Sequence, residues 1–284
     1  MNTIHLLTQY ALKELKDTYP ENEIRQICRI IFMDIFHYTN IDIHIKKYEI
    51  LDESFVAKFY DIITELKTGR PIQYIIGETE FAGLKFRLNK ATLIPRPETG
   101  ELVMWVQQYA RPGSRILDIG TGSGCIAVSL ASLLPDAQIS ALDISQEALD
   151  IARENATTNN TSVHFITGDI LHHENLNDLQ LYDIIVSNPP YIRNREKVGM
   201  DKRVLDFEPH RALFVPDNDP LIFYSKIAEF GKQHLKPGGL LFFEINEALG
   251  QETVGLLIQA GYTNTELKKD MYGRDRMCKG KNND

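Results

Sequence analysis

Apolar and polar residues near the start of the chain alternate at the spacing of helix faces. Residues 4–15, 24–35 and 54–66 each place their apolar positions on one side of a helix and their charges on the other. In the first of these runs the apolar positions are Ile4, Leu7, Ala11 and Leu15. The pattern predicts a helical bundle over residues 1–76, which we expect to help dock a partner.

The pattern changes over the next twenty residues, where glycine and proline interrupt short apolar runs. Glu80-Phe81 and Leu84–Leu88 alternate in polarity and are separated by a turn containing Gly83. Alternation with turn residues is typical of two paired strands. We therefore expect a β-hairpin linker over residues 77–98.

Strand-like and helix-like runs alternate after Ser114. The strand-like runs are 116–119, 138–142, 163–166, 182–187 and 240–245, and the helical runs are 125–134, 146–155, 221–235 and 250–261. This alternation predicts an α/β domain over residues 99–284, with a mostly parallel sheet covered by helices on both faces. The charged stretch Lys268–Arg276 is interpreted as a solvated face, and the last six residues are expected to fray.

Composition narrows the class of protein. The chain has 284 residues and a formal net charge of -8, which argues against a protein that grips nucleic acid through its phosphates. Three scattered cysteines exclude a disulfide framework and a four-cysteine zinc site. With neither a membrane-spanning run nor a signal peptide, we expect a cytoplasmic protein without a membrane partner.

A glycine loop follows the first strand of the α/β domain. Ile116–Ile119 leads directly into Gly120-Thr121-Gly122-Ser123-Gly124 and then into a helical run. Glycines permit a tight turn and let a ligand approach the backbone, and the helix start favours an anionic group. The sequence predicts a cofactor site here; the alternative is a turn that only packs the helix onto the strand.

Two acidic positions indicate what the loop would bind. Asp143 ends the second strand, 23 residues after Gly120, where an acid suits hydrogen bonds to ribose hydroxyls. The pattern lacks the last glycine of a dinucleotide fingerprint, which favours S-adenosylmethionine but leaves a dinucleotide open. Asp169 and Ile170 follow the third strand and could flank an adenine ring, although a solvated turn explains Asp169 equally well.

The most informative stretch is Asn188-Pro189-Pro190-Tyr191, directly after a strand. Prolines end a sheet ladder and rigidify the turn at an edge where α/β sheets place ligands. The side-chain oxygen of Asn188 and the carbonyl of Pro189 could accept both hydrogens of a planar nitrogen and steer its lone pair toward a methyl group. Tyr191 could stack on the planar group, so that catalysis would rest on orientation.

Together these motifs resemble S-adenosylmethionine-dependent methyltransferases that modify planar nitrogens, of which adenine-N6 DNA and protein glutamine methyltransferases share Asn-Pro-Pro-Tyr. Further stretches are similar to the release factor glutamine methyltransferase family. They are residues 69–77, 93–99, 207–209, 212–213 and 270–273 with Arg276. Two positions depart from that family's pattern: Gly100 replaces an acid, and the loop 214–220 lacks glycines.

The resemblance implies a class I, Rossmann-like fold with a seven-stranded sheet. It implies methyl transfer from S-adenosylmethionine, with S-adenosylhomocysteine as product, to the amide nitrogen of the Gly-Gly-Gln glutamine of class 1 peptide chain release factors. The implied cofactor contacts are Gly120, Thr121, Gly122, Ser123, Gly124, Asp143, Asp169, Ile170 and Asn188. The implied catalytic and substrate contacts are Asn188, Pro189, Pro190 and Tyr191, with Arg96 and Glu98 at the site entrance.

Several expectations complete this interpretation. We expect no metal, because His172-His173 lacks ligands at suitable spacing, and we expect a monomer whose partner is a protein and not a nucleic acid. The alternatives are an adenine-N6 DNA methyltransferase, which the net charge disfavours, and a binding module without catalysis. Intact Asn188-Pro189-Pro190-Tyr191 argues against the second alternative.

Overall fold

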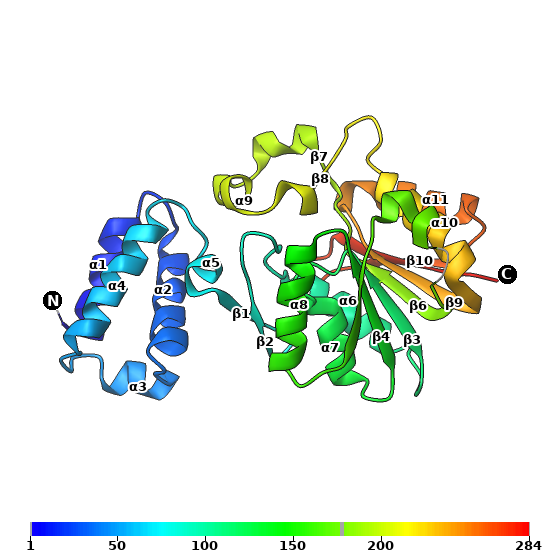
Figure 1. Cartoon of the computed structure of the whole chain (residues 1–284). Coiled ribbons are helices and arrows are strands. Elements are labelled where there is room, and N and C mark those ends of the chain that lie inside the picture. The colour runs from blue at the N-terminus through cyan, green and yellow to red at the C-terminus, as the bar shows by residue number, and fades with distance from the viewer. Residues whose placement is uncertain (1, 177–178, 284) are drawn as a thin grey trace. The chain divides into compact units, whose positions relative to one another are not determined.

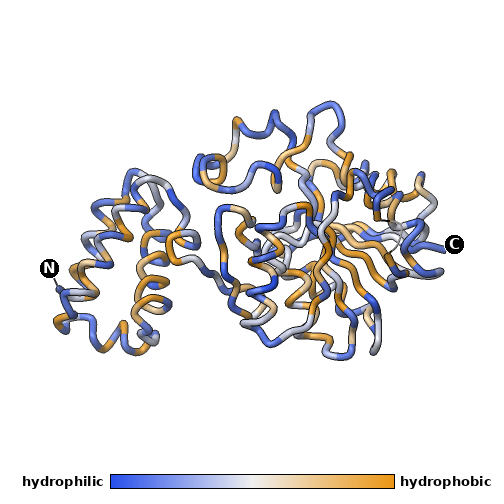
Figure 2. Tube along the Cα trace, in the orientation of Figure 1, coloured by the Kyte–Doolittle hydropathy of each residue, from blue (hydrophilic) through white to orange (hydrophobic). Residues whose placement is uncertain are grey.

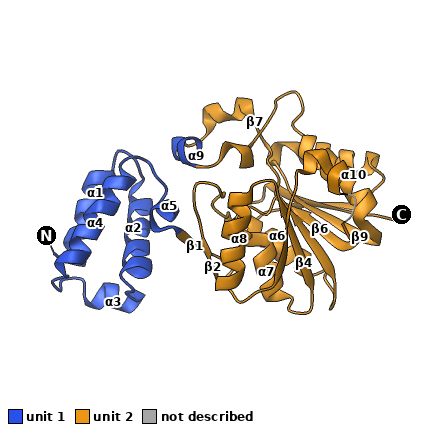
Figure 3. Ribbon diagram, viewed as in Figure 1, with its two compact units in different colours: residues 1–77, 202–207 blue, residues 78–201, 208–284 orange. Residues whose placement is uncertain are grey.

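The computed structural model describes residues 2–176 and 179–283 (Figure 1). The chain forms two compact units (Figure 3). One unit holds the residues up to Gly77 together with Lys202–Phe207, and the other holds Glu78–Asp201 and Glu208 onward. The hairpin that was expected as a linker is grouped with the second unit.

The first unit is a helical bundle with an apolar centre. The predicted helices are present as α1 Ile4–Leu15, α2 Glu21–Ile30 and α4 Glu53–Leu66. Their buried faces carry the residues of the predicted stripes, and Phe32 stacks on Phe59 with ring centroids 5.5 Å apart. A π-helical turn, Ile31–Ile35, extends α2, and α3 Asn40–Ile45 and α5 Ile72–Ile76 are short helices that the pattern did not predict.

The second unit begins with the predicted hairpin, β1 Glu78–Phe81 and β2 Leu84–Arg87. The two turn residues between the strands, Ala82 and Gly83, both have positive φ, as the tight turn of a two-residue hairpin requires. Helix α6 Pro97–Gln107 follows, with Pro97 at its first position, and was not predicted.

A seven-stranded sheet forms the second unit's centre (Figure 1). Its order is β10-β11-β9-β6-β3-β4-β5, and only β11 runs antiparallel to its neighbours. The strands are β3 Arg115–Ile119, β4 Gln138–Asp143, β5 Val163–Thr167, β6 Tyr182–Ser187, β9 Leu235–Glu244, β10 Thr263–Lys269 and β11 Asp275–Lys281. The prediction of a mostly parallel sheet of seven strands is confirmed.

Helices cover both faces of this sheet, because alternate residues of each strand face opposite ways. Ile116 packs under α6, α7 Cys125–Leu133 and α8 Gln146–Thr158, whereas Leu117 packs under α10 Ile222–His234 and α11 Gly250–Gln259. The central strands are therefore apolar on both faces, as the colours of Figure 2 show. The predicted helices on both faces are confirmed.

The C-terminal end corrects one expectation. Lys268–Arg276 is mostly exposed, as interpreted, and it contains the end of β10 and the start of β11. The last six residues were expected to fray, yet β11 lies between β10 and β9, and Asn282 is 1% exposed. The Asn282 N–H donates to the carbonyl of Gly239 at 2.8 Å. Ladder bonds on both sides fix this segment, and Asp284 lies outside the described residues.

The chain between β6 and α10 is an insertion of short elements. It contains β7 Ile192–Arg193, which pairs in parallel with β8 Phe214–Val215, and α9 Lys202–Phe207. Helix α9 is counted with the helical bundle, where Arg203 lies over the ring of Tyr19 at 4.6 Å and pairs with Glu23. The 3₁₀ turns of the second unit are Ile170–Leu176, Asn194–Gly199, His210–Ala212 and Glu247–Leu249. Among the described residues, no helix is long and apolar enough to cross a membrane.

Candidate active site

The register of the sheet brings the two predicted motifs together. Across the sheet, Leu142 pairs with Ile119, Ile119 with Ser187, and Ser187 with Phe243. The next residue of each strand therefore lies in one row at the carboxyl edge. That row is Asp143, Gly120, Asn188 and Glu244. The strand order reverses between β3 and β6, which is where open α/β sheets bind ligands.

The glycine loop turns sharply at this edge. Gly120, Gly122 and Gly124 have φ of 74°, 55° and 80°, a region that glycine adopts without steric cost. A Cβ on Gly120 or Gly122 would meet no atom within 4 Å, whereas one on Gly124 would meet the Cβ of Ala152 at 3.0 Å. The first two glycines thus border open space, and the third lets α7 pack closely against α8.

Asp143 holds the loop from the adjacent strand. Its Oδ2 accepts the N–H of Gly122 at 2.8 Å, and its Oδ1 accepts the N–H of Ser145 at 2.9 Å. Burial raises the pKa of this carboxyl, and the backbone N–H donors oppose that rise. Each oxygen keeps a second lone pair, so the same carboxylate remains able to accept a ligand hydroxyl.

A second carboxyl lies beneath the loop and was not singled out as a site residue. Asp118 is fully buried, and its Oδ2 accepts the hydroxyl of Thr121 at 2.6 Å. Burial raises its pKa to about 7, although the Thr121 hydroxyl opposes the rise. Among the described residues, Asp118 Oδ1 has no hydrogen-bond partner.

Asp169 and Ile170 lie at the next edge position, after β5. Ile170 is buried, while Asp169 accepts the N–H of Leu171 at 2.9 Å and lies 3.0 Å from Nδ1 of His172. The carbonyl of Asp143 accepts the N–H of Gly168 at 3.0 Å, which joins this turn to the end of β4. The turn thus lies beside the ribose-binding position expected at Asp143.

Asn188, at the end of β6, is anchored by its amide nitrogen. Its Nδ2 donates to Oγ1 of Thr99 at 3.2 Å, and Thr99 in turn donates to Oε2 of Glu244 at 2.6 Å. Tyr191 donates to the other oxygen of Glu244 at 3.0 Å. The end of β6 is fixed from below, because Ser187 Oγ donates to the carbonyl of Ile119 at 2.6 Å. Pro189, which lies between Asn188 and Tyr191 in the sequence, is buried.

Glu244 is the charged centre of this arrangement. It is 1% exposed, and burial raises its pKa, while the hydroxyls of Thr99 and Tyr191 and the charge of Arg276 lower it. Burial and the neighbouring Glu244 charge raise the pKa of Tyr191 far above its ordinary value, so the phenol stays protonated. Arg276 is held in place by the fully buried side chain of Asp270, with Nε and Oδ2 3.2 Å apart.

The two residues expected at the site entrance have different surroundings. Arg96 pairs with the buried carboxylate of Glu208 at 2.5 Å, which ties the chain before α6 to the part of the insertion that directly follows α9. Glu98 is half-buried in the first turn of α6, and its charge raises the pKa of Glu244. Gly100 faces the ring of Phe81, where a Cβ would make an ordinary contact at 3.8 Å.

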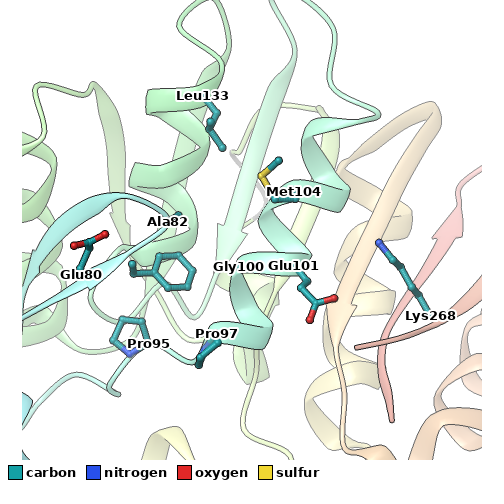
Figure 4. Close-up of a pocket in the computed structure, with 10 residues that line it drawn as sticks. Glu80, Ala82, Pro95, Pro97, Gly100, Glu101, Met104, Leu133 and Lys268 are labelled. Atoms are coloured by element: carbon teal, nitrogen blue, oxygen red, sulfur yellow. The ribbon is translucent and has the colours of Figure 1, made fainter. Parts of the chain in front are cut away.

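A pocket of about 690 Å³ lies beside this region (Figure 4). Its lining comes from β1, α6, α7 and β10, and includes Pro95, Gly100, Met104 and Lys268. None of the residues predicted for cofactor or substrate lines it. The pocket is therefore separate from the row of residues at the carboxyl edge of the sheet.

Among the described residues, no group of three or more histidine, cysteine, aspartate or glutamate side chains is placed so that it could hold a metal ion. His172 lies against Asp169, and His173 lies 3.4 Å from Glu229.

The loop and its neighbours fit an adenosine-containing cofactor. Open space lies over Gly120 and Gly122, where such a cofactor can approach the backbone. Apolar Ile170 and the carboxylate of Asp143 stand at the positions that an adenosine needs. Gly120–Gly124, Asp143, Asp169 and Ile170 would hold such a cofactor.

Sequence reasoning gave no site role to three residues of the arrangement: Thr99, Asp118 and Glu244. Thr99 was counted only as part of the stretch 93–99. Glu244 carried a usable signal, because it is a lone acid near the end of the apolar run 240–245. Its burial becomes visible only when the register of β9 against β6 is known.

Comparison with known proteins identifies the family. A model described as the methyltransferase small domain matches residues 100–206, and one described as the PrmC N-terminal domain matches residues 7–77. The release factor glutamine methyltransferase of Flavobacterium psychrophilum is 48% identical over 277 residues, covering 96% of each chain. That of Bacteroides thetaiotaomicron is 45% identical over 271 residues, covering 95% of this chain and 97% of its own.

A solved structure supports the fold separately. The T. thermophilus 16S rRNA N2 G1207 methyltransferase aligns with a TM-score of 0.53 and 18% identity, covering 72% of this chain and 49% of its own. Likeness at this level concerns the fold alone. Because these relatives match the chain over nearly its full length at 45–48% identity, the chain belongs to the release factor glutamine methyltransferase family.

Proposed function

We propose that this protein transfers a methyl group from S-adenosylmethionine to the side-chain amide nitrogen of the glutamine in the Gly-Gly-Gln motif of class 1 release factors. The observation that carries the proposal is the anchored amide of Asn188 next to the glycine loop in one row of the sheet. An acceptor in that position suits an N–H substrate beside a methyl donor.

The chemistry requires orientation because an amide nitrogen is a weak nucleophile. S-Adenosylmethionine, when bound, supplies an electrophilic methyl group and leaves as S-adenosylhomocysteine after the carbon–sulfur bond breaks and the carbon–nitrogen bond forms. Asn188 Oδ1 and the carbonyl of Pro189 would accept the two N–H hydrogens and direct the lone pair, and one of these protons is released to solvent. Holding the two reactants in line accounts for most of the rate enhancement.

Tyr191 would form a wall of the glutamine pocket. Its hydroxyl is held by Glu244 and its pKa is far above the ordinary value, so it acts through its ring and not as a base. Arg96 is paired with Glu208 and would brace the segment that leads into Thr99. These roles use no metal.

One labelling experiment tests the proposal. The protein is incubated with methyl-labelled S-adenosylmethionine and either a purified class 1 release factor or duplex DNA containing adenine. We expect label in the release factor, and no label after its Gly-Gly-Gln glutamine is changed to alanine. Label in DNA would support the adenine-N6 alternative, and label in neither would favour a binding module. The curated relatives give no support to the DNA alternative.

A further inference from the structure

A buried chain of hydrogen bonds lies behind Asn188 and was not anticipated from its motif. It runs from Asn188 Nδ2 to Thr99 Oγ1 and from Thr99 to Glu244. We propose that Thr99 and Glu244 are positioning residues that hold the amide of Asn188 with its oxygen facing the substrate. This inference rests on the proposed role of Asn188 as an acceptor of the substrate N–H.

The direction of the hydrogen bonds follows from proton counting. A carboxylate accepts and cannot donate, so the hydroxyls of Thr99 and Tyr191 both give their protons to Glu244, at 2.6 and 3.0 Å. The Thr99 oxygen then has only lone pairs to offer a third group. The atom of Asn188 that faces it must be a donor, which is the amide nitrogen.

This direction decides what the substrate meets. The oxygen and nitrogen of an asparagine amide are nearly equal in size, so packing alone does not select between the two orientations. A reversed Asn188 would set its oxygen against the Thr99 oxygen and would present N–H groups to a substrate that also carries N–H groups. With the observed orientation, Oδ1 is left on the side away from Thr99.

Burial makes the selection strong. Thr99 is 2% exposed and Glu244 is 1% exposed, so water cannot easily replace a missing hydrogen bond. Burial raises the pKa of Glu244, whereas the hydroxyls of Thr99 and Tyr191 and the charge of Arg276 oppose that rise and favour the carboxylate form that the proton count requires. Register places Glu244 beside Asn188, and α6 supplies Thr99 from its first turn.

The test compares two substitutions at one position. Thr99→Val keeps the shape of the side chain and removes the hydroxyl, whereas Thr99→Ser keeps the hydroxyl. We expect kcat for release factor methylation to fall about 10- to 100-fold in Thr99→Val and to stay within about threefold of wild type in Thr99→Ser. The dissociation constant for S-adenosylmethionine should change less than about threefold in both, which also reports that each variant is folded.

A double substitution distinguishes positioning from general support of the fold. If Thr99 acts through Asn188, adding Thr99→Val to Asn188→Ala should cause no further loss of kcat. An additive loss would overturn the inference. Equal losses in Thr99→Val and Thr99→Ser, near-normal turnover in Thr99→Val, or a parallel loss of cofactor affinity would also overturn it.

A spectroscopic measurement keeps the inference separate from the proposed function. The side-chain ¹H–¹⁵N signals of Asn188 are assigned by their absence from Asn188→Ala. We expect protons that exchange slowly with solvent in wild type and Thr99→Ser, and faster solvent exchange, with chemical shifts closer to those of a free asparagine side chain, in Thr99→Val. This result would support the positioning role even if the release factor accepted no label, whereas unchanged signals in Thr99→Val would refute it whatever the substrate.

Discussion

Asn188 carries two hydrogen-bonding atoms of nearly equal size, and its surroundings decide which of them faces the substrate. Thr99 accepts a hydrogen bond from the side-chain nitrogen of Asn188. The prolines that follow restrict the backbone conformation from which this side chain projects. In the proposed function, the hydrogen bond to Thr99 makes an otherwise ordinary polar residue at the end of a strand a directed acceptor. Its contribution should appear in the rate of methyl transfer more than in the binding of the methyl donor.

Asn188→Ala tests this expectation directly. Loss of the acceptor should lower kcat for release factor methylation by at least about 100-fold, because the amide nitrogen is no longer oriented. The dissociation constant for S-adenosylmethionine, measured by calorimetry, should rise less than about tenfold. A variant with near-normal kcat would show that Asn188 does not orient the nucleophile.

Asp118 provides a pH-dependent prediction for the unliganded protein. The pKa of its carboxyl is 3.8 when the chain is unfolded and about 7 in the folded state, because burial disfavours the charge. Between these pH values the Asp118 carboxyl binds more protons in the folded state, so the contribution of Asp118 to wild-type stability falls as pH rises. The free energy of unfolding of Asp118→Asn should therefore increase relative to that of wild type, by on the order of 1–4 kcal/mol as the pH rises from 4 to 8.

The measurement is urea unfolding of wild type and Asp118→Asn at several pH values. Asp136→Asn, at an exposed position between α7 and β4, is the matched control. A difference between Asp118→Asn and wild type that stays constant with pH, or that shrinks as pH rises, contradicts the prediction.

Sequence reasoning identified the glycine loop and Asn188 because their chemistry is written in consecutive residues. It did not identify Thr99 and Glu244 as partners, because they are separated by 145 positions and meet only through the register of the sheet. The buried partner of Arg96, Glu208, was missed as an ion pair for the same reason. Local sequence motifs thus predict the groups proposed to react, whereas the residues that hold those groups become known only from long-range contacts in the folded structure.

At the scale of elements, one side chain joins three separate segments of the second unit. Asn155 of α8 is fully buried; its Oδ1 accepts the N–H of Arg87 at 2.6 Å, and its Nδ2 donates to the carbonyls of Arg87 and Ser123 at 3.1 and 2.8 Å. Strand β2 and the glycine loop are thus both fastened to the same helix. The hairpin, whose two strands would be marginal alone, gains an anchor beyond its own turn.

Asn155→Ala should destabilise this unit by about 2–4 kcal/mol, because it leaves buried backbone groups of Arg87 and Ser123 without partners. Asn159→Ala is the control, since Asn159 is half-buried at the C-terminal cap of the same helix and bonds the hairpin only through the carbonyl of Lys85. Its cost should be under about 1 kcal/mol. Equal costs in denaturant unfolding would argue against Asn155 as the anchor.

The prediction of helices and strands succeeded where apolar residues recur at the period of one element type. It failed where charged residues replace that apolar pattern. The apolar strands β3 to β6 and helices α7 to α11 of the sheet faces stand close to the predicted ranges, apart from short α9. Strand β10 was missed because six of its seven residues, Thr263 to Lys269, are polar or charged and it forms the exposed edge. Such charge discourages edge-to-edge pairing, so it protects the strand while hiding it.

At the scale of the whole molecule, the formal net charge of -8 bears on association with a protein substrate. Attraction to a basic partner is screened over about 10 Å at 0.1 M salt. We expect KM for the release factor to rise about three- to tenfold between about 50 and 300 mM NaCl, with little change in kcat. Steady-state kinetics over a salt series checks this, and a KM that is constant or falls with salt contradicts it.

The placement of α9 with the helical bundle affects how such a protein can be recombined. Residues 202–207 leave the second unit's chain to join the first, so the polypeptide passes between the units three times and not once. If only the first 77 residues were exchanged between two relatives, Arg203 would come from one parent, and the residues at the positions of its contacts Tyr19 and Glu23 would come from the other. The bundle and this six-residue segment should therefore be inherited as a pair, and chimeras that move both together should fold better than chimeras that move one.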